Sequence, residues 1–327
     1  MNQKEIAEHF NISQSTVSIA LTRPDSSRIS HKLRREILKY CQINAPNYLR
    51  SARTWNIGFV GHENYCASPF YATLFSGISQ VASTLDYTLF VEGEKKCFQQ
   101  CSYSKFDGII DARREFEVKQ KFPAKLPQIL LNNTREDASL DCVMPDNAAV
   151  ISLAFRHLLE TGHRRIGFFA FNTVDRPHGM SVHMRERLNT FLMLCQKYDI
   201  SQEYCRTLNV TDEPDWDNGE LRAVLHEYVQ QGNLPDSLIF PDSCVVELFA
   251  ALKAEGLRVP EDISIVGWDN IDKFSTMPFM TSVDFNLAEM GRIALETLHW
   301  RIENPDKPHR RINVEPKLII RNSVKTR

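Results

Sequence analysis

The sequence predicts an α/β protein with a small helical head in front of a body of two similar α/β lobes. Three observations support this prediction. The first fifty residues contain two short helical segments separated by a tight turn. The remainder alternates short apolar runs with helical stretches, which is typical of parallel strands in a covered sheet, and it does so twice. At 327 residues, of which 43% are hydrophobic, the chain is long enough for two or three domains with ample core.

The head begins with a helix over residues 3–10, whose apolar side chains recur at helical spacing so that one face can be buried. Asn11 then tolerates the left-handed backbone that a tight break requires, and the Ser13 hydroxyl can cap the helix that starts at the next residue. A third helix is expected from a cap at Ser30 to about Cys41, because its apolar residues close a small core.

The second helix has an inward apolar stripe and an outward face of mixed chemistry. In a helix-turn-helix, the outward face lies near the helix end that enters the major groove of DNA. Glutamine can bond adenine edges, serine is less selective, and isoleucine can touch a thymine methyl. The residues expected to read bases are Gln14, Ser15, Thr16, Ser18 and Ile19.

The net charge changes sign between the head and the body. Residues 1–56 hold nine Lys and Arg against four Asp and Glu, a net +5, which leaves 30 against 37, a net −7, in residues 57–327. A positively charged end attracts DNA phosphates, so its affinity for DNA falls as the salt concentration rises. An acidic body does not bind nonspecifically along the DNA. A helical bundle that is merely solvated by Lys and Arg is the alternative, but the basic excess coincides with the turn motif. Double-stranded DNA is therefore the expected partner of the head.

The body repeats one scheme twice, with four short apolar runs in each half and helical stretches between most of them. The runs are residues 57–60, 88–91, 108–110 and 129–131 in the first half, and residues 166–169, 208–210, 238–240 and 263–266 in the second. Two such lobes side by side leave a cleft, and ligands of open α/β sheets bind outside the carboxyl ends of the strands. Residues that directly follow these runs are therefore candidates for ligand binding.

Composition and missing motifs exclude several classes of protein. No apolar run approaches the roughly twenty residues that a membrane helix needs, and the N-terminus lacks the apolar stretch of a signal peptide, so a cytoplasmic protein with no membrane partner is expected. The eight cysteines are irregularly spaced and are expected to stay reduced, Cys97 and Cys101 included. Without a G-x-x-x-x-G-K, H-E-x-x-H or C-x-x-C motif, neither an enzyme nor a metal site is expected.

Two sets of short motifs follow one another along the chain. In the head they are Ile6-Ala7-Glu8, Asn11-Ile12-Ser13, Ser15-Thr16-Val17-Ser18 and Ala20-Leu21. In the body they are residues 107–110, Asp146-Asn147, residues 157–158, 162–166 and 259–267, Asp269, Met290-Gly291, and residues 316–318 and 321–323. In this order they resemble the lactose-repressor/galactose-repressor family of bacterial regulators, and the resemblance spans nearly the entire chain.

The resemblance implies a body with the fold of periplasmic sugar-binding proteins, a homodimer, a DNA operator, a small sugar-like effector and no cofactor. It divides the chain into a DNA-binding domain at residues 1–45, a hinge at 46–56 and an effector-binding and dimerisation domain at 57–327. In that domain the N-lobe covers about residues 57–157 and 287–315, and the C-lobe about 158–284 and 318–327. The lobes are expected to be joined by crossings near residues 157–165, 284–287 and 315–319.

Polar residues at strand ends are candidate effector ligands. Asn132 and Asp242 each follow a predicted strand, although an acid before a helix is often only its N-cap. By resemblance, Arg185 falls where an arginine meets ligand hydroxyls or a carboxylate, and Asp269 falls where an acid accepts two sugar hydroxyls. Both groups can engage two hydroxyls at once. Three aromatic residues and one histidine complete the candidates: Phe70, Tyr71, Trp216 and His62. For Phe70 and Trp216, core packing is the alternative.

The hinge departs from the family pattern because it is a few residues shorter than usual. In the family this segment forms a helix on DNA that pushes a leucine into the minor groove, and Ala52 stands at the place of that leucine. A shift in register could let Tyr48 or Leu49 substitute for it. Alternatively, the hinge contacts only phosphates, through Arg50 and Arg53.

The expected function is that of a DNA-binding transcriptional regulator, a repressor in the first instance, whose operator affinity changes when a sugar or sugar derivative binds between the lobes. Pro241 stands where the family often has an asparagine that donates to the ligand, so the identity of the ligand stays open. A regulator that responds to a non-sugar metabolite, or to no ligand, is the alternative. A solute-binding protein with the same two lobes is less expected, because it would carry an export signal in place of the head.

Overall fold

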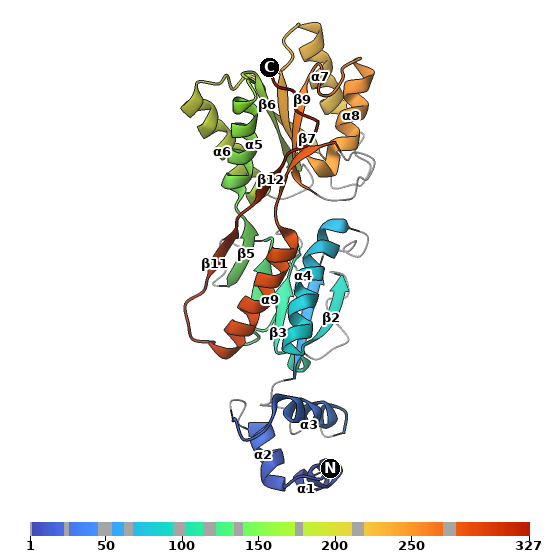
Figure 1. Cartoon of the computed structure of the whole chain (residues 1–327), viewed down its shortest axis with the longest axis vertical. Helices are drawn as coiled ribbons and strands as arrows, with labels where there is room; N and C mark the ends of the chain where they lie inside the picture. The colour runs from blue at the N-terminus through green and yellow to red at the C-terminus, as the bar shows by residue number, and fades with distance from the viewer. Residues whose placement is uncertain are drawn as a thin grey trace.

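The computed structural model describes residues 2–22, 26–44, 54–61, 68–93, 103–113, 122–133, 140–173, 179–210, 219–270 and 279–327. The chain forms a three-helix head and two α/β lobes that follow one another along the long axis of the molecule (Figure 1). The predicted fold class, a helical head on a body of two largely parallel sheets, is confirmed.

The head consists of α1 (Gln3–Phe10), α2 (Gln14–Thr22) and α3 (His31–Asn44). Asn11 ends α1 with a φ of 52°, so the tight turn uses the left-handed backbone that asparagine tolerates. The Ser13 hydroxyl accepts a hydrogen bond from the backbone N–H of Thr16 at 3.1 Å, and the Ser30 hydroxyl accepts one from Leu33 at 3.2 Å. The three helices bury one small core, which includes Ile6, Val17, Ile37 and Cys41.

The first lobe contains a six-stranded parallel sheet in the order β11-β5-β4-β3-β1-β2. Its strands are β1 (Asn56–Gly61), β2 (Thr88–Gly93), β3 (Gly108–Asp111), β4 (Gln128–Leu131), β5 (Asp141–Pro145) and β11 (Arg311–Val314). Helices α4 (Pro69–Leu85) and α9 (Leu287–Glu303) lie side by side against this sheet (Figure 1). A short 3₁₀ turn, Tyr103–Lys105, precedes β3.

The second lobe contains a six-stranded sheet in the order β12-β10-β9-β8-β6-β7, in which only the β10–β12 pairing is antiparallel. Its strands are β6 (Ile166–Thr173), β7 (Cys205–Val210), β8 (Ser237–Pro241), β9 (Ser264–Asp269), β10 (Thr281–Asp284) and β12 (Lys317–Ile319). Its helices are α5 (Asn147–Glu160), α6 (Val182–Tyr198), α7 (Gly219–Gln230), α8 (Val245–Ala254) and the 3₁₀ turn Asp242–Cys244.

The chain first passes between the lobes at residues 145–147, which corrects the crossing expected near residues 157–165. The reason is that α5 packs on α6 and on strands β8, β9, β10 and β12 of the second sheet, although it directly follows β5 of the first. Asn147 therefore begins the second lobe. Asp146, the N-cap of α5, still belongs to the first lobe, because its backbone N–H donates to the Val314 carbonyl at the end of β11.

Helices α4 and α9 lie so close together that a side chain at either of two glycine positions would collide with the other helix. A Cβ atom added at Gly77 would lie 1.8 Å from the Ala288 carbonyl oxygen, and one added at Gly291 would lie 2.0 Å from the Leu74 carbonyl oxygen. Two glycines, one on each helix, thus set the distance between these helices.

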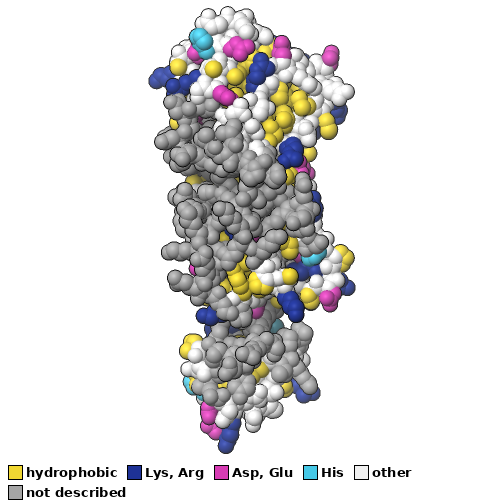
Figure 2. All heavy atoms as spheres, turned by 180° about the vertical axis from the view of Figure 1, so that it is seen from behind, with side chains coloured by type: hydrophobic (Ala, Val, Ile, Leu, Met, Phe, Trp, Pro, Cys, Tyr) yellow, Lys and Arg dark blue, Asp and Glu magenta, His cyan; other side chains and the backbone are white. Residues whose placement is uncertain are grey.

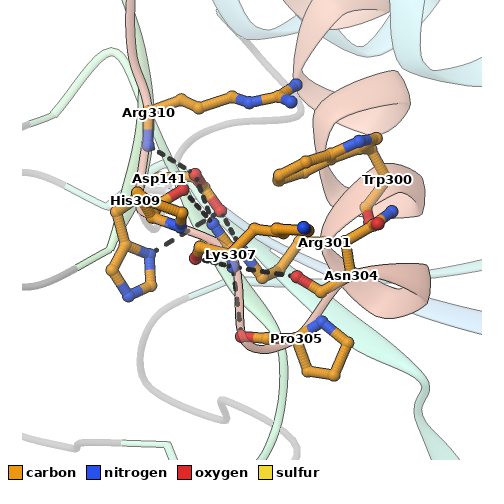
Figure 3. Close-up of polar contacts among 9 residues, drawn as sticks. Asp141, Trp300, Arg301, Asn304, Pro305, Lys307, His309 and Arg310 are labelled. Atoms are coloured by element: carbon orange, nitrogen blue, oxygen red, sulfur yellow. Dashed lines mark hydrogen bonds and ion pairs between the residues drawn. The ribbon is translucent and has the colours of Figure 1, made fainter.

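A buried arginine ties the end of α9 to β5. The Arg301 guanidinium pairs with Asp141 at 2.6 Å, and it also donates to four carbonyls of the turn that follows the helix, those of Asn304, Pro305, Lys307 and Pro308. Figure 3 shows these contacts, together with the Arg310 guanidinium over the Trp300 ring at 3.3 Å. The turn that leads into β11 is therefore fixed by side chains of the first lobe.

The segment that joins the head to the body ends in a fixed anchor. The Asp107 carboxylate accepts hydrogen bonds from the backbone N–H groups of Thr54 and Trp55, both at 2.7 Å, and from the Thr54 hydroxyl at 2.9 Å. The Trp55 ring packs against the cores of both the head and the first lobe.

The surface of the second lobe carries exposed apolar side chains (Figure 2). Among the described residues of this lobe, the exposed large apolar side chains are Met193, Tyr198, Val246 and Ile320. No helix in the part of the chain that the structure describes is both long and apolar enough to cross a membrane.

Candidate functional site

The outward face of α2 presents the residues that the sequence predicts to read DNA. Gln14 and Ser15 are exposed, whereas Thr16, Ser18 and Ile19 are half-buried. The Ser15 and Thr16 hydroxyls lie 2.7 Å and 2.8 Å from the Ser13 hydroxyl, so both take part in the cap of α2. Ile19 packs at the edge of the head core. Gln14 is thus the side chain at this helix start with the fewest constraints from the protein itself.

Several predicted residues lie outside the described residues. They are the hinge residues Tyr48, Leu49, Arg50 and Arg53 and the candidate effector ligands His62 and Trp216. Of the cysteines that the structure describes, Cys41, Cys142, Cys195, Cys205 and Cys244 are free thiols. The described residues contain no group of three or more His, Cys, Asp or Glu side chains that could hold a metal ion.

A set of polar and aromatic residues meets where the two lobes adjoin, and we call it the interlobe cluster. It consists of Asn132, Asn147, His183, Glu186, Arg187, Trp268, Asp269 and Phe285. Asn132 follows β4 of the first lobe, and the other members come from α5, α6, β9 and the end of β10.

Arg187 is the centre of the interlobe cluster. Its guanidinium is buried over the rings of Phe285 and Trp268, with centroid distances of 4.8 Å and 5.4 Å, and its Nε donates to Asn147 Oδ1 at 2.9 Å. Burial lowers the pKa of Arg187 to about 10, against the opposing effect of Asp269 and Glu186, so the group stays charged at neutral pH. Aromatic faces attract a cation, so the two rings stabilise the buried Arg187 charge.

The Asp269 carboxyl lies close enough to Arg187 for each charge to affect the pKa of the other. Asp269 ends β9 with a φ of 98°, an unusual backbone for a residue with a side chain. Burial raises the pKa of Asp269 to about 7, and the nearby Arg187 charge only partly opposes this rise. Near neutral pH the group can therefore both donate and accept a hydrogen bond.

The predicted Arg185 does not join the interlobe cluster. Its side chain is exposed on α6 and donates to the Met180 carbonyl at 3.3 Å. Residues two apart on a helix point roughly 200° from each other, so Arg187 is buried where Arg185 is not. The sequence carries a signal for Arg187, because it lies four residues before the fully buried Phe191 on the inward stripe of the helix.

Asp242 is buried within the second lobe. Its Oδ2 accepts from the Ser282 hydroxyl at 2.6 Å and from the Asn270 backbone N–H at 2.9 Å. Burial raises the pKa of Asp242 well above its usual range, although the Ser282 hydrogen bond lowers it. Its other oxygen occupies the space that a side chain at Gly267 would need, so only glycine fits there.

The predicted residues of the first lobe lie at the carboxyl ends of its strands. Tyr71, in the first turn of α4, donates its hydroxyl to the Ala112 carbonyl just after β3 at 3.2 Å, and the Phe70 ring packs edge-on against it. Asn132 ends β4 with a φ of 53°, and its carbonyl lies 3.2 Å from His183 Nε2 of the second lobe. The structure therefore brings Asn132 and Asp269 to the interlobe region, and it holds Phe70 and Tyr71 at the same sheet edge as Asn132.

Sequence reasoning missed the polar side chains that connect these groups. Asn147 Nδ2 donates to Glu186 Oε2 at 2.6 Å and lies 3.0 Å from His183 Nδ1. Burial, with a contribution from the Arg187 charge, lowers the pKa of His183 to about 4, so the ring is neutral. The Asp146-Asn147 motif marks the position of this asparagine, but the pattern alone assigns it no partner.

The helix-turn-helix head, the two parallel-sheet lobes and the charged cluster between them define a class of protein: a two-lobed ligand-binding body that carries a DNA-binding head. Residues 155–324 match the family model of the periplasmic binding protein-like domain. The chain belongs to this family and, with its helix-turn-helix head, to the lactose-repressor/galactose-repressor family of transcriptional regulators.

Known proteins resemble the chain over its full length. The ribose operon repressor of Haemophilus influenzae is 27% identical over 98% of both chains, and the transcriptional repressor PurR of Aliivibrio salmonicida is 24% identical over 98% of both. The lac repressor dimer bound to operator and an anti-inducer superposes with a TM-score of 0.68 at 17% identity over 99% of each chain. The regulator CelR in complex with cellobiose gives 0.66 at 22% identity over 99% of each.

Proposed function

We propose that this regulator is a repressor whose operator affinity is controlled by a sugar or sugar derivative bound at the interlobe cluster. The observation that supports this most directly is that the buried Arg187 guanidinium and the Asp269 carboxyl lie close enough for each charge to affect the pKa of the other. Both groups can engage neighbouring hydroxyls of a polyol in pairs. Relatives and fold neighbours are named for ribose and cellobiose, among them a ribose-bound regulator from Enterococcus faecium with a TM-score of 0.66 at 21% identity over 83% of this chain and 99% of that one.

The proposed ligand roles divide between the lobes. Arg187 and Asp269 of the second lobe hold the hydroxyls, and Asn132, Phe70 and Tyr71 of the first lobe close over the other side of the ligand. Asp242 keeps the end of β9 in place through Asn270 rather than binding the ligand itself.

The proposed DNA-binding unit is a cytoplasmic homodimer that presents two heads to a near-palindromic operator. The domain division stays as the sequence predicts it, with a head at residues 1–45, a hinge at 46–56 and a body at 57–327. Gln14, Ser15 and Ser18 are proposed to contact base edges, since α2 is the second helix of the motif. A ligand that prefers one arrangement of the lobes changes the spacing of the heads and thereby the affinity.

The test measures binding of the purified full chain to promoter fragments by fluorescence anisotropy. The measurement is repeated with a panel of sugars, nucleobases and phosphorylated sugars. We expect sequence-selective binding and a change of at least about tenfold with one sugar or sugar derivative, which corresponds to about 1.4 kcal/mol of coupling. Asp269→Ala should lose this response and keep the affinity of the ligand-free protein. Selective binding with no response to any ligand would contradict the proposed control.

A further inference from the structure

We propose that Asn147 and His183 form a relay that connects Arg187 to the contact between the two lobes, with His183 as the positioning residue that holds Asn132. This inference rests on the proposed function, because it describes how occupancy at Arg187 reaches the first lobe. The relay runs from Arg187 Nε to Asn147 Oδ1, from Asn147 Nδ2 to His183 Nδ1, and from His183 Nε2 to the Asn132 carbonyl. Asn132 belongs to the first lobe, and the other three residues belong to the second.

The direction of each hydrogen bond in the relay follows from the chemistry of the groups. An arginine Nε is always a donor, so the Asn147 oxygen must face Arg187 and its amide nitrogen must face Glu186 and His183. Because that nitrogen donates, His183 Nδ1 accepts, and the ring proton of a neutral His183 must be on Nε2. A backbone carbonyl only accepts, so the Asn132 contact independently requires the same tautomer.

Among the residues that the structure describes, every side-chain hydrogen-bonding group of Asn147 is used, which makes the relay sensitive to a ligand. Asn147 uses both amide hydrogens and its oxygen, and the charged groups that face the His183 ring are Arg187 and Glu186 on its own helix, with Asp269 of β9 beyond Arg187. A ligand oxygen that takes the Arg187 Nε–H leaves the Asn147 oxygen without its donor, while Glu186 still holds the Asn147 amide nitrogen. Asn147 can then shift toward Glu186 and away from His183 Nδ1, so the His183 ring loses the contact that orients its Nε2–H toward the Asn132 carbonyl. Occupancy at Arg187 thus weakens the one hydrogen bond of the relay that joins the lobes.

The first test is the tautomer of His183 in the wild-type full chain, without DNA or effector, by two-bond ¹H–¹⁵N correlation spectra of the histidine rings. His183→Gln identifies its signals. We expect a neutral ring protonated at Nε2 that does not titrate between pH 5.5 and 8, on the basis of the tautomer argument and the buried site. In Asn147→Asp, the carboxylate accepts from both neighbours and Nδ1 gains a proton, so the His183 pKa should rise by roughly 1–3 pH units. A ring protonated at Nδ1 in the wild-type protein, or no rise in Asn147→Asp, would overturn the relay.

The second test uses two variants of His183 that each keep one half of the relay. A glutamine amide reaches the position of Nε2 and can donate to Asn132, whereas an asparagine amide reaches only the position of Nδ1. Hydrogen exchange of the ligand-free chains should be about fivefold faster in His183→Asn than in His183→Gln at residues 129–133 and 179–184, as expected for one lost hydrogen bond. Equal exchange in the two variants would contradict the positioning role, and circular dichroism checks that both are folded. Neither test uses an effector, so the relay and the proposed sugar response can fail separately.

Discussion

At the scale of single residues, two positions along one helix separate a buried arginine from an exposed one. The chain carries Arg185 and Arg187 within one turn of α6, and only Arg187 is buried against aromatic rings. This provides a matched pair of variants with the same change of charge. We expect Arg187→Ala to abolish the effector response and Arg185→Ala to leave it within about twofold, because an exposed side chain contributes little. Isothermal titration with the effector found in the panel measures both, and equal losses would show that Arg187 has no special role.

The Asp269 carboxyl predicts a pH dependence of stability. Its pKa is about 7 in the folded chain, against an ordinary value of 3.8, so the folded state binds the proton more tightly. A raised pKa of an acid means that stability is lost as the pH rises from about 4 to about 7. Asparagine does not titrate. We therefore expect the free energy of unfolding of Asp269→Asn, relative to that of the wild type, to be higher at pH 8 than at pH 5 by on the order of 2 kcal/mol. Urea unfolding at both pH values measures it, and a constant difference would mean that Asp269 does not titrate in this range.

Substitution of Gln14 should change the base preference of DNA binding without changing its salt dependence. If its amide bonds one base edge, Gln14→Ala should relax the preference at one base pair by about 1–3 kcal/mol and leave the salt dependence of binding unchanged. Competition among operators with single base changes measures the preference. A uniform loss of affinity over all operators would assign Gln14 to the phosphates instead.

The sequence predicts the candidate site residues that directly follow strands. It does not predict those whose contacts depend on how two elements pack together. Asn132 and Asp269 follow apolar runs, and the carboxyl ends of parallel strands lie where ligands bind, so the pattern locates them. Asn147 and His183 start helices, where their contacts depend on how α5 and α6 pack. No periodicity in the sequence encodes that packing.

At the scale of elements, the glycines of α4 and α9 predict where the first lobe does not tolerate an added methyl group. Gly291→Ala should destabilise the chain by about 1–3 kcal/mol, because the new Cβ would meet the backbone of Leu74 and the helices would have to separate. Gly219→Ala is the control, since no atom of the described residues lies within 4 Å of a Cβ at this helix start, and it should be neutral or slightly stabilising. Denaturant midpoints of the two variants compare them, and similar midpoints would refute the close packing.

The sequence predicts the strands on one side of each sheet but not the two strands at its other end. All eight predicted apolar runs form strands, including the partly exposed edge strands β2 and β7. β5, β10, β11 and β12 were not predicted. β5 begins with an aspartate that pairs with Arg301, and β11 and β12 are short edge strands with exposed residues. Such strands are defined by the neighbours they pair with rather than by an apolar pattern of their own.

At the scale of the whole molecule, the separation of charge predicts that the two ligands respond differently to salt. The head segment carries +5 and the rest −7, and each phosphate contact by Lys or Arg contributes about −0.9 to the slope of log K against log salt. We expect operator affinity to fall steeply between 50 and 200 mM salt and the affinity for an uncharged sugar to stay within about twofold over the same range. Binding curves at several salt concentrations measure both slopes. A flat slope for operator binding would remove the electrostatic role of the head.

Neither lobe is made from one continuous stretch of chain, since α9 and β11 complete the first lobe only after nearly all of the second has been passed. On a ribosome that adds roughly 5–20 residues per second, about 10–30 s separate the emergence of β5 from that of its neighbour β11. During this interval β5 has an open edge, and the nascent lobe needs protection from aggregation. The head is built from one continuous stretch, α1 to α3, and can therefore fold before either lobe is complete.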